Sequence, residues 1–211
     1  MRYTLWGEPN SGSFMVEAAL AEAKQSVDLI DLDLARDEHR AADYRQVSPL
    51  CKIPALRFPD GSVMIESAAI LLALDEAHPD ALLMPPRAGG ERRSALRWLL
   101  YIAAEIYPLI EMSDYPHRFA PPETSDVGMR SVVRTRLRER WRAVEEAAGG
   151  GGSFLPTGFS AVDLSVAVIS RWEVGDEWRA KEGRKLDAIA RAVAERPSIA
   201  PVWRRHFGAK A

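Results

Sequence analysis

The stretch Lys52-Ile53-Pro54-Ala55-Leu56 places a proline inside a run of residues that otherwise favours a β-strand. Proline has no main-chain N–H to contribute to a sheet, so Pro54 is expected at a sheet edge or at the first residue of a strand. At such an edge, the main-chain N–H and C=O of Ile53 would be open to an extended ligand. The stretch therefore predicts a place where a peptide-like molecule pairs with the sheet.

The residues that follow predict a hairpin and then a helix. Asp60-Gly61 lies between two apolar runs, which is a strong signal for two antiparallel strands. Glu66 and Ser67 come next, directly before an apolar helical segment. Ser67 would lie at the helix N-terminus, which favours a carboxylate, and Glu66 could bind an ammonium group. This combination suits a small peptide with a free amino-acid end, although a plain helix cap and a first-turn acid also fit the pattern.

The N-terminal region predicts a β-α-β unit. Residues 3–6 and 27–32 have strand patterns, and a helix expected over 14–24 connects them, which indicates a parallel pair. The turn Gly7-Glu8-Pro9-Asn10-Ser11-Gly12-Ser13 precedes this helix, where N–H groups and the helix dipole stabilise an anion such as a thiolate. This is half of a thioredoxin-like domain, but the turn has no Cys-x-x-Cys pair, which argues against dithiol redox chemistry.

The character of the chain changes after this α/β region. His78-Pro79 ends a helical pattern, and proline and glycine pairs follow it. Apolar residues then recur at helical spacing to about residue 112 and over 127–148, and three or four further helices are expected. The predicted division is an α/β domain over 1–78, a linker over 79–90 and an all-helical domain over 91–211.

The helical region carries a capping signature. In Phe159-Ser160-Ala161-Val162-Asp163-Leu164, Ser160 fits an N-cap and Asp163 fits the reciprocal position three residues later. Further on, Arg196-Pro197-Ser198 is expected to start a last helix. The box predicts where a core helix begins and carries no chemistry.

Composition narrows the classes of partner. The chain has 211 residues with a formal net charge of -2, which gives no electrostatic reason to expect nucleic acid or an anionic membrane. The single cysteine, Cys51, excludes an intrachain disulfide and favours a reducing compartment. No apolar run approaches the roughly 20 residues that span a bilayer. We therefore expect a soluble, cytoplasmic protein.

Several of these segments together resemble a known family. Lys52–Leu56, the Asp60-Gly61 turn and Glu66-Ser67-Ala68-Ala69-Ile70 resemble the glutathione-binding segment of cytosolic glutathione S-transferases. The capping box and Arg196-Pro197-Ser198 resemble the C-terminal domain of the same family. The class of transferase that the chain resembles is a bacterial one, either serine-type or unclassified. The resemblance covers about residues 2–203. It implies the glutathione S-transferase fold, in which an N-terminal thioredoxin-like domain precedes a C-terminal helical-bundle domain.

The resemblance also implies a set of glutathione-binding residues. In this family the proline is cis, the residue before it pairs with the cysteinyl backbone of glutathione, and an acid-serine pair binds the γ-glutamyl end. These roles fall on Pro54, Ile53, Glu66 and Ser67. Lys52 is expected near the glycyl carboxylate.

The residue that activates glutathione in this family lies in the turn before the first helix and is a Tyr, Ser or Cys. Ser11 and Ser13 are the candidates here, with Asn10 behind them. Matching Gly7-x-Pro9-x-Ser11 to the serine-type pattern selects Ser11, whereas a shift of two residues selects Ser13. The chosen hydroxyl would donate a hydrogen bond to the thiolate and so favour its ionisation. The alternative interpretation is that either serine is the N-cap of the helix.

The implied function is that of a glutathione S-transferase. Glutathione would be the co-substrate, its thiolate would attack a small hydrophobic electrophile in detoxification, and no metal would take part. A homodimer is implied, with no nucleic acid or membrane as partner. Two alternatives remain open: a non-catalytic binding or regulatory protein with this fold, and a glutathione-dependent lyase, dehalogenase, isomerase or peroxidase.

Overall fold

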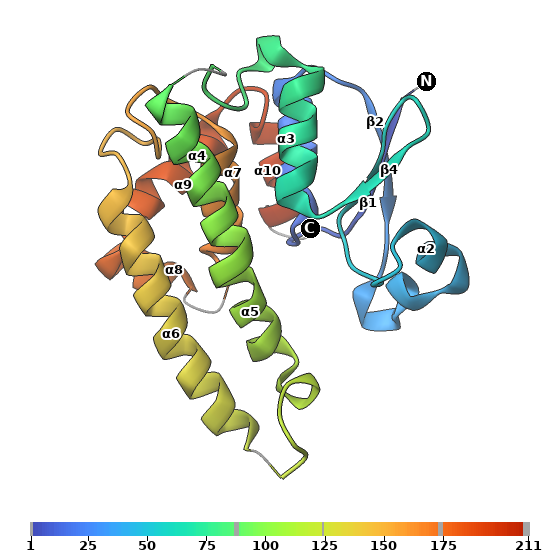
Figure 1. Ribbon diagram of the computed structural model, residues 1–211, viewed down its shortest axis with the longest axis vertical. Coiled ribbons are helices and arrows are strands. Elements are labelled where there is room, and N and C mark those ends of the chain that lie inside the picture. The colour runs from blue at the N-terminus through green and yellow to red at the C-terminus, as the bar shows by residue number, and fades with distance from the viewer. Residues whose placement is uncertain (1, 87–88, 124, 173–174, 209–211) are drawn as a thin grey trace. The chain divides into compact units, whose positions relative to one another are not determined.

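The computed structural model describes residues 2–86, 89–123, 125–172 and 175–208 (Figure 1). The chain divides into two compact units, a first unit of Met1–Pro86 with Val193–Ala211, and a second unit of Arg87–Ala192. The C-terminal segment is thus grouped with the α/β region, whereas the sequence pattern places it with the helical region. The N-terminal region has the thioredoxin-like arrangement and the helical region follows it in the chain, as predicted.

The first unit is built on a four-stranded mixed sheet with the order β2-β1-β3-β4. β1 pairs in parallel with β2, and the hairpin partners β3 and β4 are antiparallel, which confirms both predicted strand pairs. β1 and β3 are antiparallel and join the two halves of the sheet. The strands are β1 (Tyr3–Gly7), β2 (Val27–Asp31), β3 (Ala55–Arg57) and β4 (Val63–Ile65).

Helices cover both faces of this sheet. α1 (Ser13–Glu22) and α3 (Ser67–Ala77) pack on each other, α1 contacts β1, and α3 contacts β4. On the opposite face, Tyr44 of α2 (Ala42–Val47) packs against Trp6 and Ala55. Short 3-10 turns lie at Leu34–Arg36, Glu38–Arg40 and Pro79–Ala81. The last helix, α10, is Ala200–Phe207, and it begins after Arg196-Pro197-Ser198 rather than within it.

Helix α1 is buried on all sides, and its residues from Ser13 to Leu20 are all buried. Its neighbours are the strand β1, the helix α3 and the helix α10. A helix in this position has no polar face for solvent, so each of its polar side chains needs a partner within the protein.

The second unit is helical (Figure 1). α4 continues through a π-helical turn, Ile102–Ile106, into α5, so the single helix predicted to residue 112 is present but interrupted. Pro108 follows this turn and lacks the N–H that would bond the carbonyl of Ala104, which accounts for the local widening. The helices are α4 (Gly90–Tyr101), α5 (Tyr107–Asp114), α6 (Asp126–Ala147), α7 (Ala161–Ile169), α8 (Gly175–Glu182) and α9 (Arg184–Glu195), with a 3-10 turn at Pro116–Arg118.

The predicted capping box starts α7, whose nine residues are all buried. The Asp163 carboxylate accepts hydrogen bonds from the main-chain N–H of Phe154 at 2.6 Å and of Ser160 at 2.7 Å. The Ser160 hydroxyl lies 3.0 Å from the same carboxylate. Burial raises the pKa of Asp163 to about 6, against the opposing effect of these hydrogen bonds. The carboxylate therefore closes the loop before α7 onto the helix start.

Replacing Asp163 with Ala should lower the free energy of unfolding by about 2 to 4 kcal/mol, because two buried N–H groups lose their acceptor. Urea unfolding followed by circular dichroism measures this loss. Asp126→Ala is the matched control, because Asp126 is an exposed acid in the first turn of α6, and its loss should cost less than about 1 kcal/mol. Equal effects of the two substitutions would contradict the role of the box.

The same carboxyl group predicts a pH dependence. The pKa of Asp163 is raised in the folded state. Between about pH 4 and about pH 6, Asp163 therefore keeps its proton in the folded protein, whereas the unfolded chain has already released it. The contribution of this group to stability should therefore fall as the pH rises through that range. The difference in unfolding free energy between the wild type and Asp163→Ala should be larger near pH 4 than near pH 7. A difference that grows with pH would contradict this assignment.

Candidate functional site

The register of the sheet brings three distant segments to one edge. Trp6 of β1 is paired with Ala55 of β3, and Ala55 is paired with Ile65 of β4. One residue beyond this row lie Gly7, Pro54 and Glu66, because β1 and β4 end at this edge and β3 begins there. The turn 7–13, the segment Ile53-Pro54 and the pair Glu66-Ser67 therefore meet at the same edge of the sheet, the edge where β1 and β4 end and β3 begins. Pro54 directly precedes the first residue of β3, which is an inner strand and not an edge strand.

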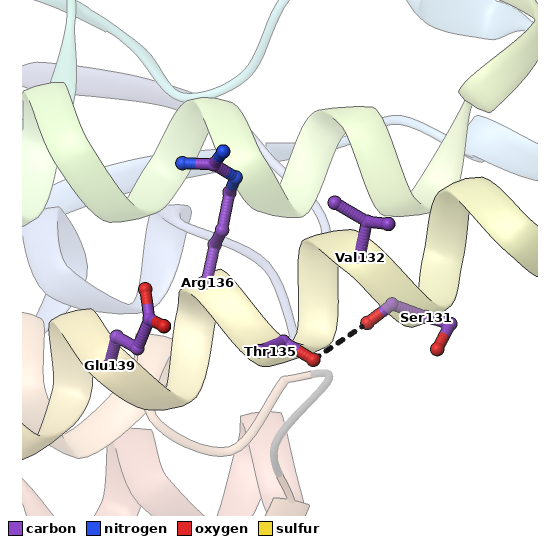
Figure 2. Close-up of a pocket in the computed structure, with 5 residues that line it drawn as sticks. All are labelled: Ser131, Val132, Thr135, Arg136 and Glu139. Carbon is purple, nitrogen blue, oxygen red and sulfur yellow. Dashed lines mark hydrogen bonds between the residues drawn. The ribbon is translucent and has the colours of Figure 1, made fainter.

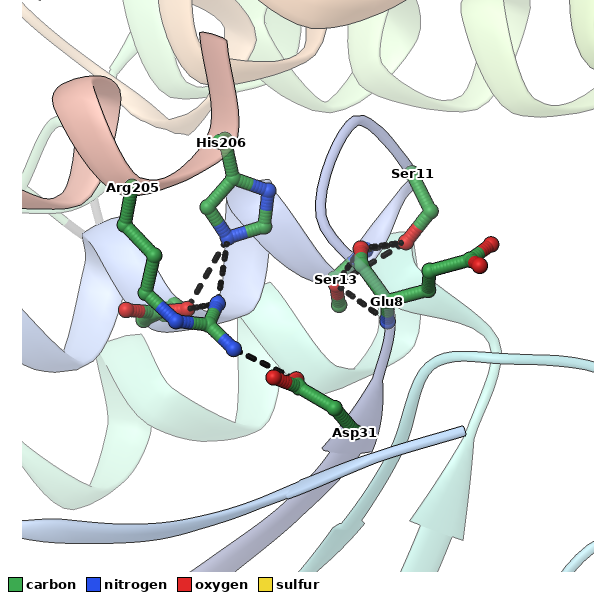
Figure 3. Close-up of polar contacts among 7 residues, drawn as sticks. Glu8, Ser11, Ser13, Asp31, Arg205 and His206 are labelled. Carbon is green, nitrogen blue, oxygen red and sulfur yellow. Dashed lines mark hydrogen bonds and ion pairs between the residues drawn. The ribbon is translucent and has the colours of Figure 1, made fainter. Parts of the chain in front are cut away.

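The two serines of the turn share one acceptor (Figure 3). The Ser11 hydroxyl donates to the main-chain carbonyl of Glu8 at 2.6 Å, and the Ser13 hydroxyl reaches the same carbonyl at 2.9 Å. The two hydroxyl oxygens are 2.9 Å apart. Ser13 also accepts a hydrogen bond from the N–H of Glu8 at 3.3 Å. The turn is thus closed by a local hydrogen-bond network.

The two hydroxyls differ in access. Ser13 is only 3% exposed, whereas Ser11 is half-buried. If the Ser11 hydroxyl rotates toward a ligand, Ser13 still satisfies the carbonyl of Glu8, so the rotation leaves no unpaired buried acceptor. The N-cap of α1 is Gly12, so the N-cap interpretation is wrong for both serines, although Ser11 accepts a hydrogen bond from the N–H of Ser13 at 3.2 Å.

Gly7 permits this closure and was not recognised as a site residue in the sequence. A Cβ atom on Gly7 would lie 2.3 Å from the Cβ of Ser13, which is far inside contact distance. Only glycine therefore allows the end of β1 to approach the first residue of α1 this closely. The available signal was the glycine at the junction of a strand and a polar turn.

The segment before the proline is held from α2. The Tyr44 hydroxyl donates to the carbonyl of Lys52 at 2.8 Å, and the N–H of Lys52 donates to the Ser48 hydroxyl at 3.1 Å. Burial raises the pKa of Tyr44 to about 12, so its hydroxyl keeps its hydrogen at neutral pH. Tyr44 and Ser48 are supporting residues that sequence reasoning missed, because only the folded chain brings α2 to this segment.

The Ile53–Pro54 peptide bond is cis, the isomer that the family resemblance implies. Within the described ranges, the main chain of Ile53 makes no hydrogen bond to the protein. It follows that an extended ligand at this edge would meet an N–H and a C=O that the fold does not use.

Glu66 has an unusual backbone conformation at the start of α3. Its φ is 68° and its ψ is 100°, and its side chain is exposed. Its carbonyl accepts the first hydrogen bond of the helix, from the N–H of Ile70 at 2.9 Å. A positive φ at a residue other than glycine costs about 1 to 3 kcal/mol and is commonly found at functional sites. Ser67, the first residue of α3, is half-buried beside it.

The remaining candidates lie on the surface of the first unit. Asn10 is exposed at the tip of the turn with a φ of 61°, a conformation that Asn tolerates. Lys52 is exposed at the end of the segment that Tyr44 and Ser48 hold. Both side chains are therefore accessible to a ligand at this edge.

The second unit has a pocket on its surface. Its lining residues all belong to α6 and are Ser131, Val132, Thr135, Arg136 and Glu139 (Figure 2). The Thr135 hydroxyl is bonded to the carbonyl of Ser131 at 3.1 Å, which is an ordinary contact within a helix. The pocket contains none of the predicted glutathione residues, and we assign it no role.

Neither a cluster of metal-binding side chains nor a membrane-spanning helix is present in the part of the chain that the structure describes. Across residues 2–86, 89–123, 125–172 and 175–208, no group of three or more His, Cys, Asp or Glu side chains is placed to bind a metal ion. In the same part of the chain, no helix has the length and apolar character needed to cross a membrane.

Comparisons with known proteins agree with this arrangement. Residues 13–77 match the family model described as "Glutathione S-transferase, N-terminal domain". The chain is 27% identical over 207 residues to the GST-like protein YncG of Escherichia coli K12, covering 96% of this chain and 97% of that protein. It is 26% identical over 200 residues to the glutathione S-transferase GstA of Escherichia coli O157:H7, covering 92% and 94% of the two chains.

A solved structure shows the same fold. The crystal structure of a glutathione transferase homologue from Sulfitobacter with bound glutathione aligns with a TM-score of 0.87 at 24% identity, covering 95% of this chain and 96% of that one. The family model over the N-terminal region and the full-length relatives together support the bacterial glutathione S-transferase family that the sequence resembles, and the Sulfitobacter structure shows that the chain has the fold of that family.

Proposed function

We propose that this protein binds glutathione at the edge formed by the turn 7–13, the Ile53-Pro54 segment and the Glu66-Ser67 pair, and promotes attack of the glutathione thiolate on a small hydrophobic electrophile. The observation that carries this proposal is the strand register, which gathers the predicted residues at one edge of the sheet. The glutathione in the Sulfitobacter structure supports it, because that protein has the same fold.

The proposed binding mode assigns each part of the tripeptide to a segment. The cysteinyl backbone pairs with the main chain of Ile53, beside Pro54, as an added strand. The γ-glutamyl ammonium meets the carboxylate of Glu66, and the γ-glutamyl carboxylate meets Ser67 at the N-terminus of α3. Lys52 attracts the glycyl carboxylate by its charge.

The proposed chemistry centres on the sulfur atom. Its thiol proton passes to solvent, and the thiolate is stabilised by the Ser11 hydroxyl and by the N-terminus of α1, with Asn10 behind the turn. The sulfur then uses an electron pair to form a bond to the electrophilic carbon, and the leaving group departs with its bonding electrons. Ser13 keeps the turn closed and serves as the alternative donor if the sulfur lies deeper.

The biological setting is part of the same proposal. We place the protein in the cytoplasm as a homodimer that acts in detoxification, as the family resemblance implies. Glutathione is its co-substrate, and neither metal, nucleic acid nor membrane takes part.

Two measurements test the proposal. Titration calorimetry should show that the protein binds glutathione. Its affinity for oxidised glutathione, or for a peptide without the γ-glutamyl group, should be lower. A panel of aryl halides, epoxides, activated alkenes, haloalkanes and peroxides should then reveal turnover with at least one class. Absence of glutathione binding would refute the proposed site, whereas binding without turnover on any class would favour the non-catalytic alternative.

Ser67→Ala should weaken glutathione binding by about 1 to 3 kcal/mol, the usual cost of leaving a charged group short of a hydrogen bond. Calorimetry on the folded variant measures the change in affinity. Ser62→Ala is the matched control, because Ser62 is an exposed serine in the hairpin turn at the opposite end of β4. If Ser67→Ala binds glutathione as tightly as the wild type does, Ser67 only begins α3 and does not bind the ligand.

Ser11→Ala should raise the thiol pKa of bound glutathione by about one to two units, because a charge-assisted hydrogen bond contributes about 1.5 to 3 kcal/mol. Affinity should change little, since Ile53, Glu66 and Ser67 hold the peptide. Ultraviolet absorbance of the thiolate in pH titrations of the complex measures the shift.

Ser13→Ala is the comparison within the same turn. It should shift the thiol pKa much less than Ser11→Ala does, because the buried Ser13 hydroxyl bonds the carbonyl of Glu8 and affects the sulfur only through the closure of the turn. A shift in Ser13→Ala without one in Ser11→Ala would move the role to Ser13. If neither variant shifts the titration, the N–H groups of the turn or Asn10 carry the activation.

A further inference from the structure

The C-terminal helix α10 packs against the helix that starts at the thiolate turn. The Phe14 ring, next to Ser13, lies 5.4 Å from the Trp203 ring and 5.1 Å from the Phe207 ring, measured between centroids. Phe14 is fully buried, and the His206 ring lies 5.4 Å from it. The first turn of α1 therefore packs directly against aromatic side chains from the far end of the chain.

A buried carboxylate strengthens this contact one turn further along α1. Glu17, whose side chain is 9% exposed, lies with its Oε2 atom 2.7 Å from a guanidinium nitrogen of Arg205 and 2.9 Å from Nε2 of His206. The His206 side chain is fully buried. Because α1 has no solvent-facing side, this carboxylate depends on α10 for its neutralisation.

Arg205 also contacts the sheet. Its second terminal nitrogen binds the carboxylate of Asp31, the last residue of β2 (Figure 3). Asp31 is paired with Gly7 across the parallel strands. The turn 7–13 starts at Gly7 and ends in α1, so one guanidinium group connects both ends of the turn, through Asp31 on one side and Glu17 on the other.

A second ion pair fixes the other end of α1. The Glu22 carboxylate binds the guanidinium of Arg196 at 2.7 and 2.9 Å, and it also accepts a hydrogen bond from the Ser198 hydroxyl. The pKa of Glu22 is lowered by these partners, since their effect outweighs that of its burial. α1 is thus held at two points along its length by the C-terminal segment.

We infer that Arg205 is a positioning residue for the thiolate turn, acting through Glu17 and Asp31 to fix the start of α1 against Gly7 and so to keep the Ser11 hydroxyl at its working position. This inference rests on the proposed glutathione site, but its structural part concerns the turn alone. Arg205 touches neither glutathione nor the electrophile in this scheme. The fork of the guanidinium suits this role, because its two terminal nitrogens bind two carboxylates at once.

The test compares Arg205→Met with Arg204→Met. Arg204 is an exposed arginine of the same helix, so the control removes the same charge and length without the bridge. The first readout needs no ligand: amide hydrogen exchange at Phe14 and Met15, whose N–H groups bond the carbonyls of Ser11 and Gly12 within the turn. Arg205→Met should exchange these amides about three to ten times faster than the wild type, and Arg204→Met should match the wild type.

The second readout is the thiol pKa of bound glutathione in the same variants. It should rise by about one unit in Arg205→Met and stay unchanged in Arg204→Met, because a loosened turn weakens a charge-assisted hydrogen bond. Arg205→Lys distinguishes the bridge between two carboxylates from the effect of the positive charge, because lysine keeps the charge but has no forked guanidinium group. The inference requires that the thiol pKa follows the exchange rate in every variant.

Two results would overturn the inference. The first is normal exchange at Phe14 and Met15 in a folded Arg205→Met protein. The second is a normal thiol pKa in Arg205→Lys while the exchange stays fast, which would show that Arg205 acts through its charge alone. Asp31→Asn gives a milder variant if Arg205→Met does not fold, because Asp31 is exposed and its loss leaves Glu17 paired. If the wild type does not bind glutathione, the proposed function fails, while the exchange measurement still decides the role of Arg205.

Discussion

The hydrogen-bonded register of three strands, with Trp6 opposite Ala55 and Ala55 opposite Ile65, sets where the three proposed glutathione-binding segments meet. A shift of one residue in either pairing would move the segments after β1 and before β3 to opposite faces. The apolar residues of the two central strands keep the register in place, since Leu5 and Leu56 are buried on the same face. The binding edge is therefore a consequence of core packing rather than of the polar residues that would bind the ligand.

Helix α1 links this edge to the end of the chain. Its start is tied to the sheet by the close approach of Gly7 and Ser13, and its buried face carries Phe14 and Glu17 toward α10. A carboxylate in such a position is costly unless it is paired, so the helix and the C-terminal segment depend on each other. The proposed thiolate site would thus draw its rigidity from residues almost 200 positions away in the sequence.

The second unit is organised around a buried helix and the loop that precedes it. Its central helix α7 is buried along its whole length, and the Asp163 carboxylate fixes the loop that leads into it. None of the proposed glutathione contacts lies in this unit. No motif in the sequence marks an electrophile site, because an apolar pocket is defined by shape and not by particular functional groups.

Local sequence determined the hairpin around Asp60-Gly61 and the helix starts at Ser67 and Ala161, because turn and capping chemistry act over a few residues. The candidate glutathione residues came from the family resemblance of the same segments. Tertiary structure alone decided what depends on distant partners. The sequence leaves both Ser11 and Ser13 as candidates, and only the folded chain shows that Ser13 is buried close against Gly7 whereas Ser11 is half-buried. The bridge from Arg205 to Glu17 and Asp31 joins residues 188 and 174 positions apart, and no local pattern encodes such a pairing, because it exists only when α10 packs against α1.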